Sequence, residues 1–102
     1  MKSSFVLTSD VVIQFVLKTA QKQLPLKKVF LFGSRARGTE FKNSDYDLAI
    51  FAPGVTELEW SRFYLKVLEE KPSLHKVDLL NLEKCNEKLK KRILKEGKIL
   101  YG

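Results

Sequence analysis

Residues 29–38 read Val-Phe-Leu-Phe-Gly-Ser-Arg-Ala-Arg-Gly, an apolar run that ends in a glycine-rich, basic turn. Four apolar residues closed by a glycine are typical of a buried β-strand. Gly33 and Ser34 then predict a turn into a short helix, where outward-pointing backbone N–H groups and the Ser34 hydroxyl can hold a phosphate. Arg35 and Arg37 follow at once, so we expect them to add charge-assisted contacts to phosphate oxygens. A Gly-Ser pair on its own fits an ordinary tight turn equally well.

Two aspartates, Asp45 and Asp47, lead into a second apolar run at residues 48–52. Residues i and i+2 of a strand face the same way, so both carboxylates are expected on one side of the strand. The alternative is local turn chemistry, because Asn43-Ser44-Asp45 is also a good turn-forming sequence.

A third carboxylate, Asp78, lies within a predicted strand at residues 76–80. An ionised carboxylate among apolar residues is costly unless it is paired. If this strand neighbours the second one, Asp78 faces Asp45 and Asp47, and two carboxylates ~4 Å apart repel by roughly 4 kcal/mol in a medium of intermediate dielectric. The cluster therefore predicts a bound cation, and oxygen ligands beside phosphates favour a pair of Mg²⁺ ions. A structural aspartate satisfied near a sheet edge is the alternative for Asp78.

Helical and strand patterns alternate along the chain, which predicts an α/β (α+β) fold with a small mixed sheet and helices mainly on one face. Apolar residues recur at helical spacing over residues 12–24, and Pro25 ends this first helix. Ser9 or Asp10 can cap its start. The length favours a single domain over residues 1–102.

A second long helix is expected to begin at Thr56, which forms a capping-box pattern with Glu59. Its apolar stripe, more typical of core than of a base-stacking platform, comprises Trp60, Phe63, Tyr64, Val67 and Leu68. A last helix is expected over residues 82–96 with Gly97 at its end. Residues 99–101 are expected to fold back onto the core.

The charge balance is basic, with 19 Lys+Arg against 12 Asp+Glu and a net charge of +7. This balance fits an anionic partner, such as a nucleotide, a nucleic acid or an acidic protein face, and it equally fits a soluble, self-repelling surface. The single cysteine, Cys85, excludes an internal disulfide, so a reducing cytoplasm is the expected location. No signal peptide and no membrane-spanning run is apparent, and no membrane partner is expected.

The motifs described above resemble those of the minimal nucleotidyltransferase (MNT) family, a branch of the polymerase-beta-like nucleotidyltransferase superfamily. The signature is Gly33-Ser34, ten intervening residues, and then Asp45-x-Asp47. The resemblance runs from about Leu26 to Tyr101 and includes the segments at residues 32–38, 44–48, 77–79 and 93–101.

The resemblance implies the polymerase-beta-like nucleotidyltransferase fold and a role for each signature residue. Gly33 and Ser34 would hold the triphosphate, Asp45 and Asp47 would hold both metal ions, and Asp78 would assist the ion that activates the attacking hydroxyl. The implied reaction is Mg²⁺-dependent transfer of AMP, or another NMP, from ATP to an acceptor hydroxyl. Members of the MNT branch often act as antitoxins beside a helical HEPN-domain toxin, so a toxin–antitoxin partner protein is expected to supply that hydroxyl.

Two other functions stay open. One is a non-catalytic, nucleotide-binding antitoxin that acts by contact, and the intact aspartate set argues against it. The other is transfer to a small molecule such as an aminoglycoside. The short chain argues against that function, because a small acceptor needs walls around it. The acceptor is therefore expected on a partner protein or on a second copy of this chain, as in a homodimer.

The remaining polar residues receive no catalytic role. His75 is expected to be a surface or packing residue, and Cys85 a plain residue of the last helix. A basic face of the last helix is usually solvated surface, although it could also dock an acidic partner or RNA. That face comprises Lys88, Lys91, Arg92 and Lys95.

Overall fold

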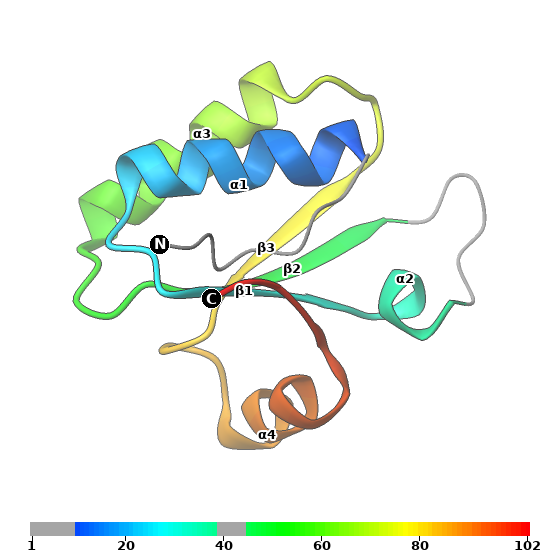
Figure 1. Ribbon diagram of the computed structural model, residues 1–102. Helices are drawn as coiled ribbons and strands as arrows, with labels where there is room; N and C mark the ends of the chain where they lie inside the picture. The colour runs from blue at the N-terminus through cyan, green and yellow to red at the C-terminus, as the bar shows by residue number, and fades with distance from the viewer. Residues whose placement is uncertain (1–9, 39–44) are drawn as a thin grey trace.

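The computed structural model describes residues 10–38 and 45–102 as a four-stranded mixed sheet flanked by helices (Figure 1). The proposed Ser9 cap and the Asn43-Ser44 turn lie outside the described residues. The elements are α1 (Val11–Gln23), β1 (Lys28–Phe32), α2 (Ser34–Arg37), β2 (Tyr46–Phe51), α3 (Glu57–Glu70), β3 (Val77–Asn81), α4 (Glu87–Glu96) and β4 (Lys98–Tyr101). Across these two ranges, no helix has both the length and the apolar character needed to cross a membrane.

The strand order is β3-β2-β1-β4. β1 pairs antiparallel with β2 and with β4, whereas β2 and β3 are parallel. Parallel neighbours need a long crossover, and α3 supplies it between β2 and β3. As a result, the C-terminal end of β1 and the N-terminal ends of β2 and β3 meet at one end of the sheet.

Two apolar clusters lie on opposite faces of the sheet. α1 and α3 cover one face and α4 covers the other (Figure 1). Along β2, Leu48 and Ile50 belong to the cluster under α1 and α3, while Ala49 packs with Ile93 of α4. This alternation is the period of a strand, and each large apolar side chain buried in this way stabilises the fold by about 1.5–3 kcal/mol. The expected mixed sheet, with most helix on one face, is confirmed.

Side-chain caps fix where the two long helices begin. Asp10 Oδ1 accepts the N–H groups of Val12 at 2.9 Å and of Ile13 at 3.1 Å, so Asp10 caps α1. Thr56 Oγ1 accepts the Glu59 N–H at 3.1 Å, and Glu59 Oε1 accepts the Thr56 N–H at 2.9 Å. This reciprocal pair is the predicted capping box of α3.

The last helix is shorter than predicted. α4 begins at Glu87 because Asn86 caps it, with Asn86 Oδ1 accepting the Leu89 N–H at 2.8 Å. Leu82 is instead buried in the apolar cluster beside α4. Cys85 therefore lies before the helix and not within it, and its thiol donates to the Leu82 carbonyl at 3.4 Å.

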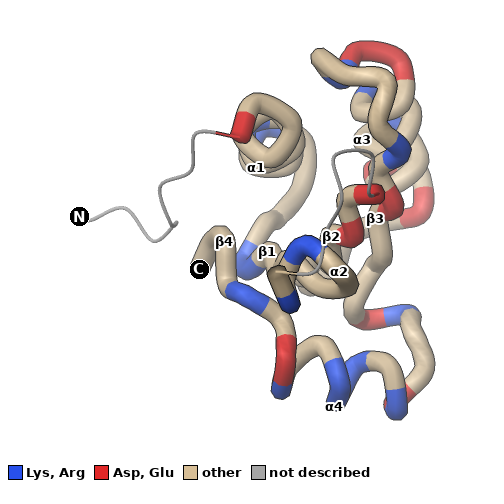
Figure 2. Tube along the Cα trace, turned by 90° about the vertical axis from the view of Figure 1, so that its right-hand side faces the viewer, with Lys and Arg blue, Asp and Glu red and all other residues tan. Residues whose placement is uncertain are grey.

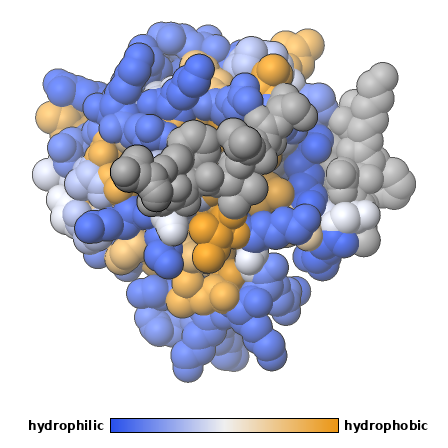
Figure 3. Space-filling model, viewed as in Figure 1, coloured by the Kyte–Doolittle hydropathy of each residue, from blue (hydrophilic) through white to orange (hydrophobic). Residues whose placement is uncertain are grey.

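Residues 98–101 fold back as expected, but they do so as a strand, so the sheet has four strands and not three. β4 pairs with β1, and the chain reaches it through Gly97, where an added Cβ would lie 2.7 Å from the Ile93 carbonyl oxygen. On the face seen in Figure 3, side chains are mostly hydrophilic, and apolar ones gather near the centre of the view, above α4. Leu94 of α4 and Ile99 of β4 are among the exposed apolar residues.

The apolar stripe of α3 is narrower than predicted. Phe63 and Val67 are fully buried, and Trp60 is partly buried against the same cluster. Tyr64 and Leu68 are 36% and 40% exposed. The helix packs on α1 and the sheet through one side only, so residues at the margin of the stripe remain in contact with solvent.

Candidate active site

The signature residues meet at the end of the sheet where β1 stops and where β2 and β3 start. In the strand register, Phe32 is opposite Asp47, and Asp47 is opposite Asp78. The turn that follows Phe32 therefore lies beside the two carboxylates. Figure 2 shows the same arrangement, with acidic positions at the starts of β2 and β3 next to the basic helix α2.

Gly33 is required at the turn for two separate reasons. Its backbone has φ 76° and ψ −156°, a conformation that is essentially restricted to glycine. In addition, a Cβ added at Gly33 would overlap the Asp47 side chain, with Oδ2 as the nearest atom. The Asp47 carboxylate is thus packed directly against the Gly33 backbone, and the two halves of the signature form one contact.

Asp47 also lies against a second carboxylate. Its side chain is within hydrogen-bonding reach of Asp78 on the adjacent strand. Burial raises the pKa of Asp47 above its ordinary value, and the charge of Asp78, its hydrogen bond and the charge of Asp45 raise this pKa further, while Lys76 opposes the shift. Lys76 Nζ approaches Asp78 Oδ1 at 3.6 Å, but both side chains are about half exposed or more, so this ion pair contributes little to stability.

Asp45 is placed less tightly than its two partners. It immediately precedes β2, is exposed, and is close enough for its charge to act on the pKa of Asp47. Within residues 10–38 and 45–102, no three acidic, histidine or cysteine side chains gather into a ready metal-binding group. The structure therefore brings Asp47 and Asp78 together and leaves Asp45 at the rim. The two adjoining carboxylates beside the Gly33-Ser34 turn nevertheless provide oxygen ligands of the kind that Mg²⁺ prefers when it is bound together with a phosphate.

Asp78 is more accessible than its apolar neighbours suggested. It is the second residue of β3, and 47% of its side chain is exposed. The expectation that Asp78 stands in the middle of an apolar strand was wrong, because Asp78 is near the start of β3 at the end of the sheet. The unfavourable free energy of this cluster therefore comes from the proximity of two like charges and not from the desolvation of Asp78.

Helix α2 carries the predicted phosphate-binding residues. It is a single turn in which the N–H groups of Ala36 and Arg37 donate to the Gly33 carbonyl, both at 3.2 Å. Ser34 and Arg35 are half-buried, whereas Arg37 is exposed. The guanidinium carbon of Arg35 lies 3.8 Å from the centroid of the Tyr46 ring.

Tyr46 is a site residue that sequence reasoning missed. It stands between Asp45 and Asp47, is only 5% exposed, and donates its hydroxyl to Asp10 Oδ2 at 2.7 Å. Burial, with the hydrogen bond to Asp10 and its charge, raises the pKa of Tyr46 to about 12, so the hydroxyl stays a donor at neutral pH. His75 meets the ring edge-on at 5.7 Å between centroids, so this histidine is a packing residue, as expected, although beside the site. An aromatic residue alternating with two aspartates was the only signal available.

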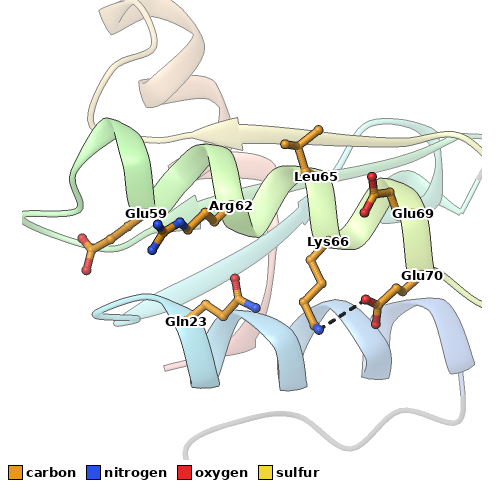
Figure 4. Close-up of a pocket in the computed structure, with 7 residues that line it drawn as sticks. All are labelled: Gln23, Glu59, Arg62, Leu65, Lys66, Glu69 and Glu70. Carbon is orange, nitrogen blue, oxygen red and sulfur yellow. Dashed lines mark hydrogen bonds and ion pairs between the residues drawn. The ribbon is translucent and has the colours of Figure 1, made fainter.

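Two hollows border the signature residues, one beside Asp45 and the other beside Gly33. One of about 340 Å³ is lined by Asp45, Leu74, His75 and Lys76. Another of about 200 Å³ lies between the Gly33 turn and α4, with Arg37 and Arg92 in its lining. A wider hollow of about 630 Å³ between α1 and α3 is lined by none of the signature residues (Figure 4).

The double requirement for Gly33 predicts the effect of a single methyl group. Gly33→Ala should destabilise the protein by about 1–3 kcal/mol for the backbone alone, and by more because the Cβ displaces Asp47. Gly38→Ala is a control for a methyl group added at a positive φ, since a Cβ at Gly38 meets nothing within 4 Å, and its left-handed backbone (φ 75°, ψ 18°) strains alanine less than that of Gly33. Urea denaturation of the two variants should show the larger loss for Gly33→Ala. The contact itself is isolated by repeating Gly33→Ala in an Asp47→Ala background, where the loss should be smaller. An equal loss for Gly33→Ala with and without the Asp47 side chain would mean that the contact with Asp47 is unimportant.

The raised pKa of Asp47 predicts a pH dependence in metal-free protein. The folded state binds the Asp47 proton more tightly than the unfolded state does. The contribution of Asp47 to the free energy of unfolding is therefore fully present below the ordinary pKa of an aspartate, and it is lost as the pH rises through the raised pKa of Asp47. Asp47→Asn cannot ionise and should lack this fall. Denaturation in chelator between about pH 3 and pH 7 measures it, with the exposed Glu69→Gln as control. A wild-type pH profile in Asp47→Asn would contradict the proposed repulsion.

Comparison with known proteins agrees with this geometry. The family model described as Polymerase beta, Nucleotidyltransferase matches residues 14–102. The protein adenylyltransferase MntA of Shewanella oneidensis is 30% identical over 92 residues, which cover 85% of this chain and 63% of the relative, so the chain spans less than two thirds of that protein.

Two solved structures have the same fold. A toxin–antitoxin crystal structure with AMP-PNP aligns with a TM-score of 0.69 and 26% identity, over 87% of this chain and 72% of that one. A structure described as a minimal nucleotidyltransferase aligns with a TM-score of 0.62 and 27% identity, over 83% and 85% of the two chains. The chain belongs to the polymerase beta nucleotidyltransferase family, and within that family it is similar to the minimal nucleotidyltransferases.

Proposed function

We propose that this protein is a Mg²⁺-dependent nucleotidyltransferase that moves AMP from ATP to a hydroxyl of a partner protein. The observation that carries the proposal is the position of the Asp47 carboxylate, which packs against Gly33 on one side and adjoins Asp78 on the other. A triphosphate bound at the Gly33-Ser34 turn would lie next to both carboxylates. Phosphoryl chemistry needs this juxtaposition of an anion-binding turn and metal-binding oxygens.

Each signature residue receives a role in the proposed reaction. The acceptor oxygen attacks the α-phosphorus, the bond from that phosphorus to the bridging oxygen of the β-phosphate breaks, and pyrophosphate leaves. Gly33 and Ser34 hold the triphosphate, and Asp45 and Asp47 hold the metal. We assign to Asp78 the task of making the acceptor hydroxyl easier to deprotonate. Mg²⁺, when bound, would neutralise charge on the phosphates and on the leaving oxygen.

The choice of AMP and of a protein acceptor is supported by the relatives. The MntA relative is named a protein adenylyltransferase, and the toxin–antitoxin structure that aligns with this chain holds AMP-PNP. We therefore assign the chain, as one nucleotidyltransferase domain, to the antitoxin side of a toxin–antitoxin pair with a helical HEPN-type partner. The chain spans 63% of MntA, so the acceptor and the partner protein are proposed here and rest on this partial similarity.

The basic face of α4 offers one surface for such a partner. Lys88, Lys91 and Lys95 are exposed on this helix, and Arg92 forms an ion pair with Glu96 at 3.7 Å (Figure 2). This face adjoins the hollow beside the Gly33 turn, which Arg92 also lines. An acidic surface docked on α4 would therefore stand close to the bound triphosphate.

Transfer of label tests the reaction. The protein, a HEPN-type protein from the same genome and Mg²⁺ are incubated with ATP labelled on the α-phosphate or on the γ-phosphate. Only the α-label should move to the partner, and Asp47→Asn or Asp78→Asn should slow this transfer by at least about 100-fold, as when a group that stabilises transition-state charge is lost. The control Glu69→Gln should transfer normally.

Two other outcomes are informative. Movement of the γ-label would make the protein a kinase and contradict the proposal. Neutralisation of the toxin with no transfer of either label would support the non-catalytic antitoxin instead.

A further inference from the structure

A buried aromatic platform lies under one of the two arginines of α2. The Arg35 guanidinium carbon is 3.8 Å from the centre of the Tyr46 ring, whereas no such ring contact is found for Arg37 within the described residues. A cation at this distance from an aromatic face is attracted by the π-electrons, and the attraction grows when the pair is partly desolvated. Arg35 is half-buried and Tyr46 is 5% exposed, so the contact is of this stronger kind.

The platform itself is held in place from several sides. The Tyr46 hydroxyl donates to Asp10 Oδ2 at 2.7 Å, and the backbone N–H donates to the Lys76 carbonyl at 2.9 Å. His75 closes on the ring edge-on. Three elements, namely the start of α1, the strand β2 and the segment before β3, therefore fix the position of this ring.

Asp10 links the platform to the long helix α1. Its Oδ1 caps that helix through Val12 and Ile13, while its Oδ2 accepts the Tyr46 hydroxyl. A single carboxylate therefore sets the start of α1 and the orientation of the ring. A helix cap needs only one of these oxygens, and the second oxygen is the one that accepts the Tyr46 hydroxyl.

The position of the pair connects it to the nucleotide site. Arg35 is the second residue after Gly33, and Tyr46 lies between Asp45 and Asp47. An arginine side chain loses much conformational freedom when it binds an anion, and a surface that holds it beforehand reduces this loss. A guanidinium stacked on a fixed ring holds its planar set of N–H donors in one orientation, at the margin of that ring.

We propose that Tyr46, anchored by Asp10, is a positioning residue that holds Arg35 in place to bind the phosphates of the nucleoside triphosphate. The proposal rests on the proposed function for the identity of that ligand. Arg37 lies on the same turn of helix, but it lines the hollow next to α4 together with Arg92 and does not stack on the Tyr46 ring.

A double-mutant cycle on the affinity for Mg²⁺–AMP-PNP tests the proposal. Arg35→Ala should weaken binding by about 10-fold or more, as expected for a hydrogen bond to a charged group. Tyr46→Leu should weaken it by about 3–10-fold through loss of the stacked cation. The double variant should bind no more weakly than Arg35→Ala alone, because Tyr46 acts through Arg35.

Arg37→Ala supplies the matched control. Combined with Tyr46→Leu, its loss of affinity should multiply with that of Tyr46→Leu, because the two side chains act independently. All affinities are measured well below each variant's melting temperature. If Tyr46→Leu does not fold, the cycle is run with Tyr46→Phe, which keeps the ring and loses the bond to Asp10. Its smaller loss, about 2–3-fold, should likewise vanish in the Arg35→Ala background.

The outcomes separate this proposal from the proposed function. If Tyr46→Leu lowers only the melting temperature and leaves the affinity of the folded protein unchanged, Tyr46 is structural and the positioning role is wrong. Losses that multiply for Tyr46 and Arg35 would also overturn it, while the proposed function stands. If the wild-type protein shows no affinity for Mg²⁺–AMP-PNP, both proposals fail together.

Discussion

The contact between the Asp47 carboxylate and the Gly33 backbone is the constraint from which the site follows. It fixes the turn after β1 against β2, and only a residue without a Cβ permits it. The same carboxylate adjoins Asp78 across the parallel pair β2–β3. Two like charges are thus held beside the Gly33-Ser34 turn, and their mutual repulsion is unfavourable in the absence of a cation. The strain is local, and the apolar clusters on both faces of the sheet stabilise the fold around it.

The arrangement of strands explains why three distant segments can share this site. The antiparallel pair β1–β2 brings the end of one strand to the start of the other, and the α3 crossover returns the chain so that β3 starts beside β2. α1 contributes from the other direction, since Asp10 joins its N-terminus to Tyr46. A few polar side chains at one end of the sheet are therefore positioned jointly by the strand pairing, by the α3 crossover and by the first helix.

Much of this could be predicted from local pattern. The apolar run before Gly33, the capping box at Thr56 and the spacing of the aspartates are short-range signals, and each corresponds to an element or a contact of the structure. The start of α4, strand β4 and the exposure of Asp78 could not be predicted, because they depend on which strands are neighbours and where the sheet ends. The stacking of Arg35 on Tyr46 is of the same kind, since the two residues meet only through the fold. The metal-binding roles of Asp45, Asp47 and Asp78 remain predictions.

Binding of Mn²⁺, a paramagnetic substitute for Mg²⁺, tests the central claim most directly. Electron paramagnetic resonance can measure free Mn²⁺ as the protein is titrated in the presence of AMP-PNP. The account predicts that nucleotide and metal bind together, and that Asp47→Asn and Asp78→Asn each weaken Mn²⁺ binding by about 10-fold or more, whereas Glu69→Gln does not. An unchanged Mn²⁺ affinity in both aspartate variants would contradict the account, because the paired carboxylates would then have a purely structural role.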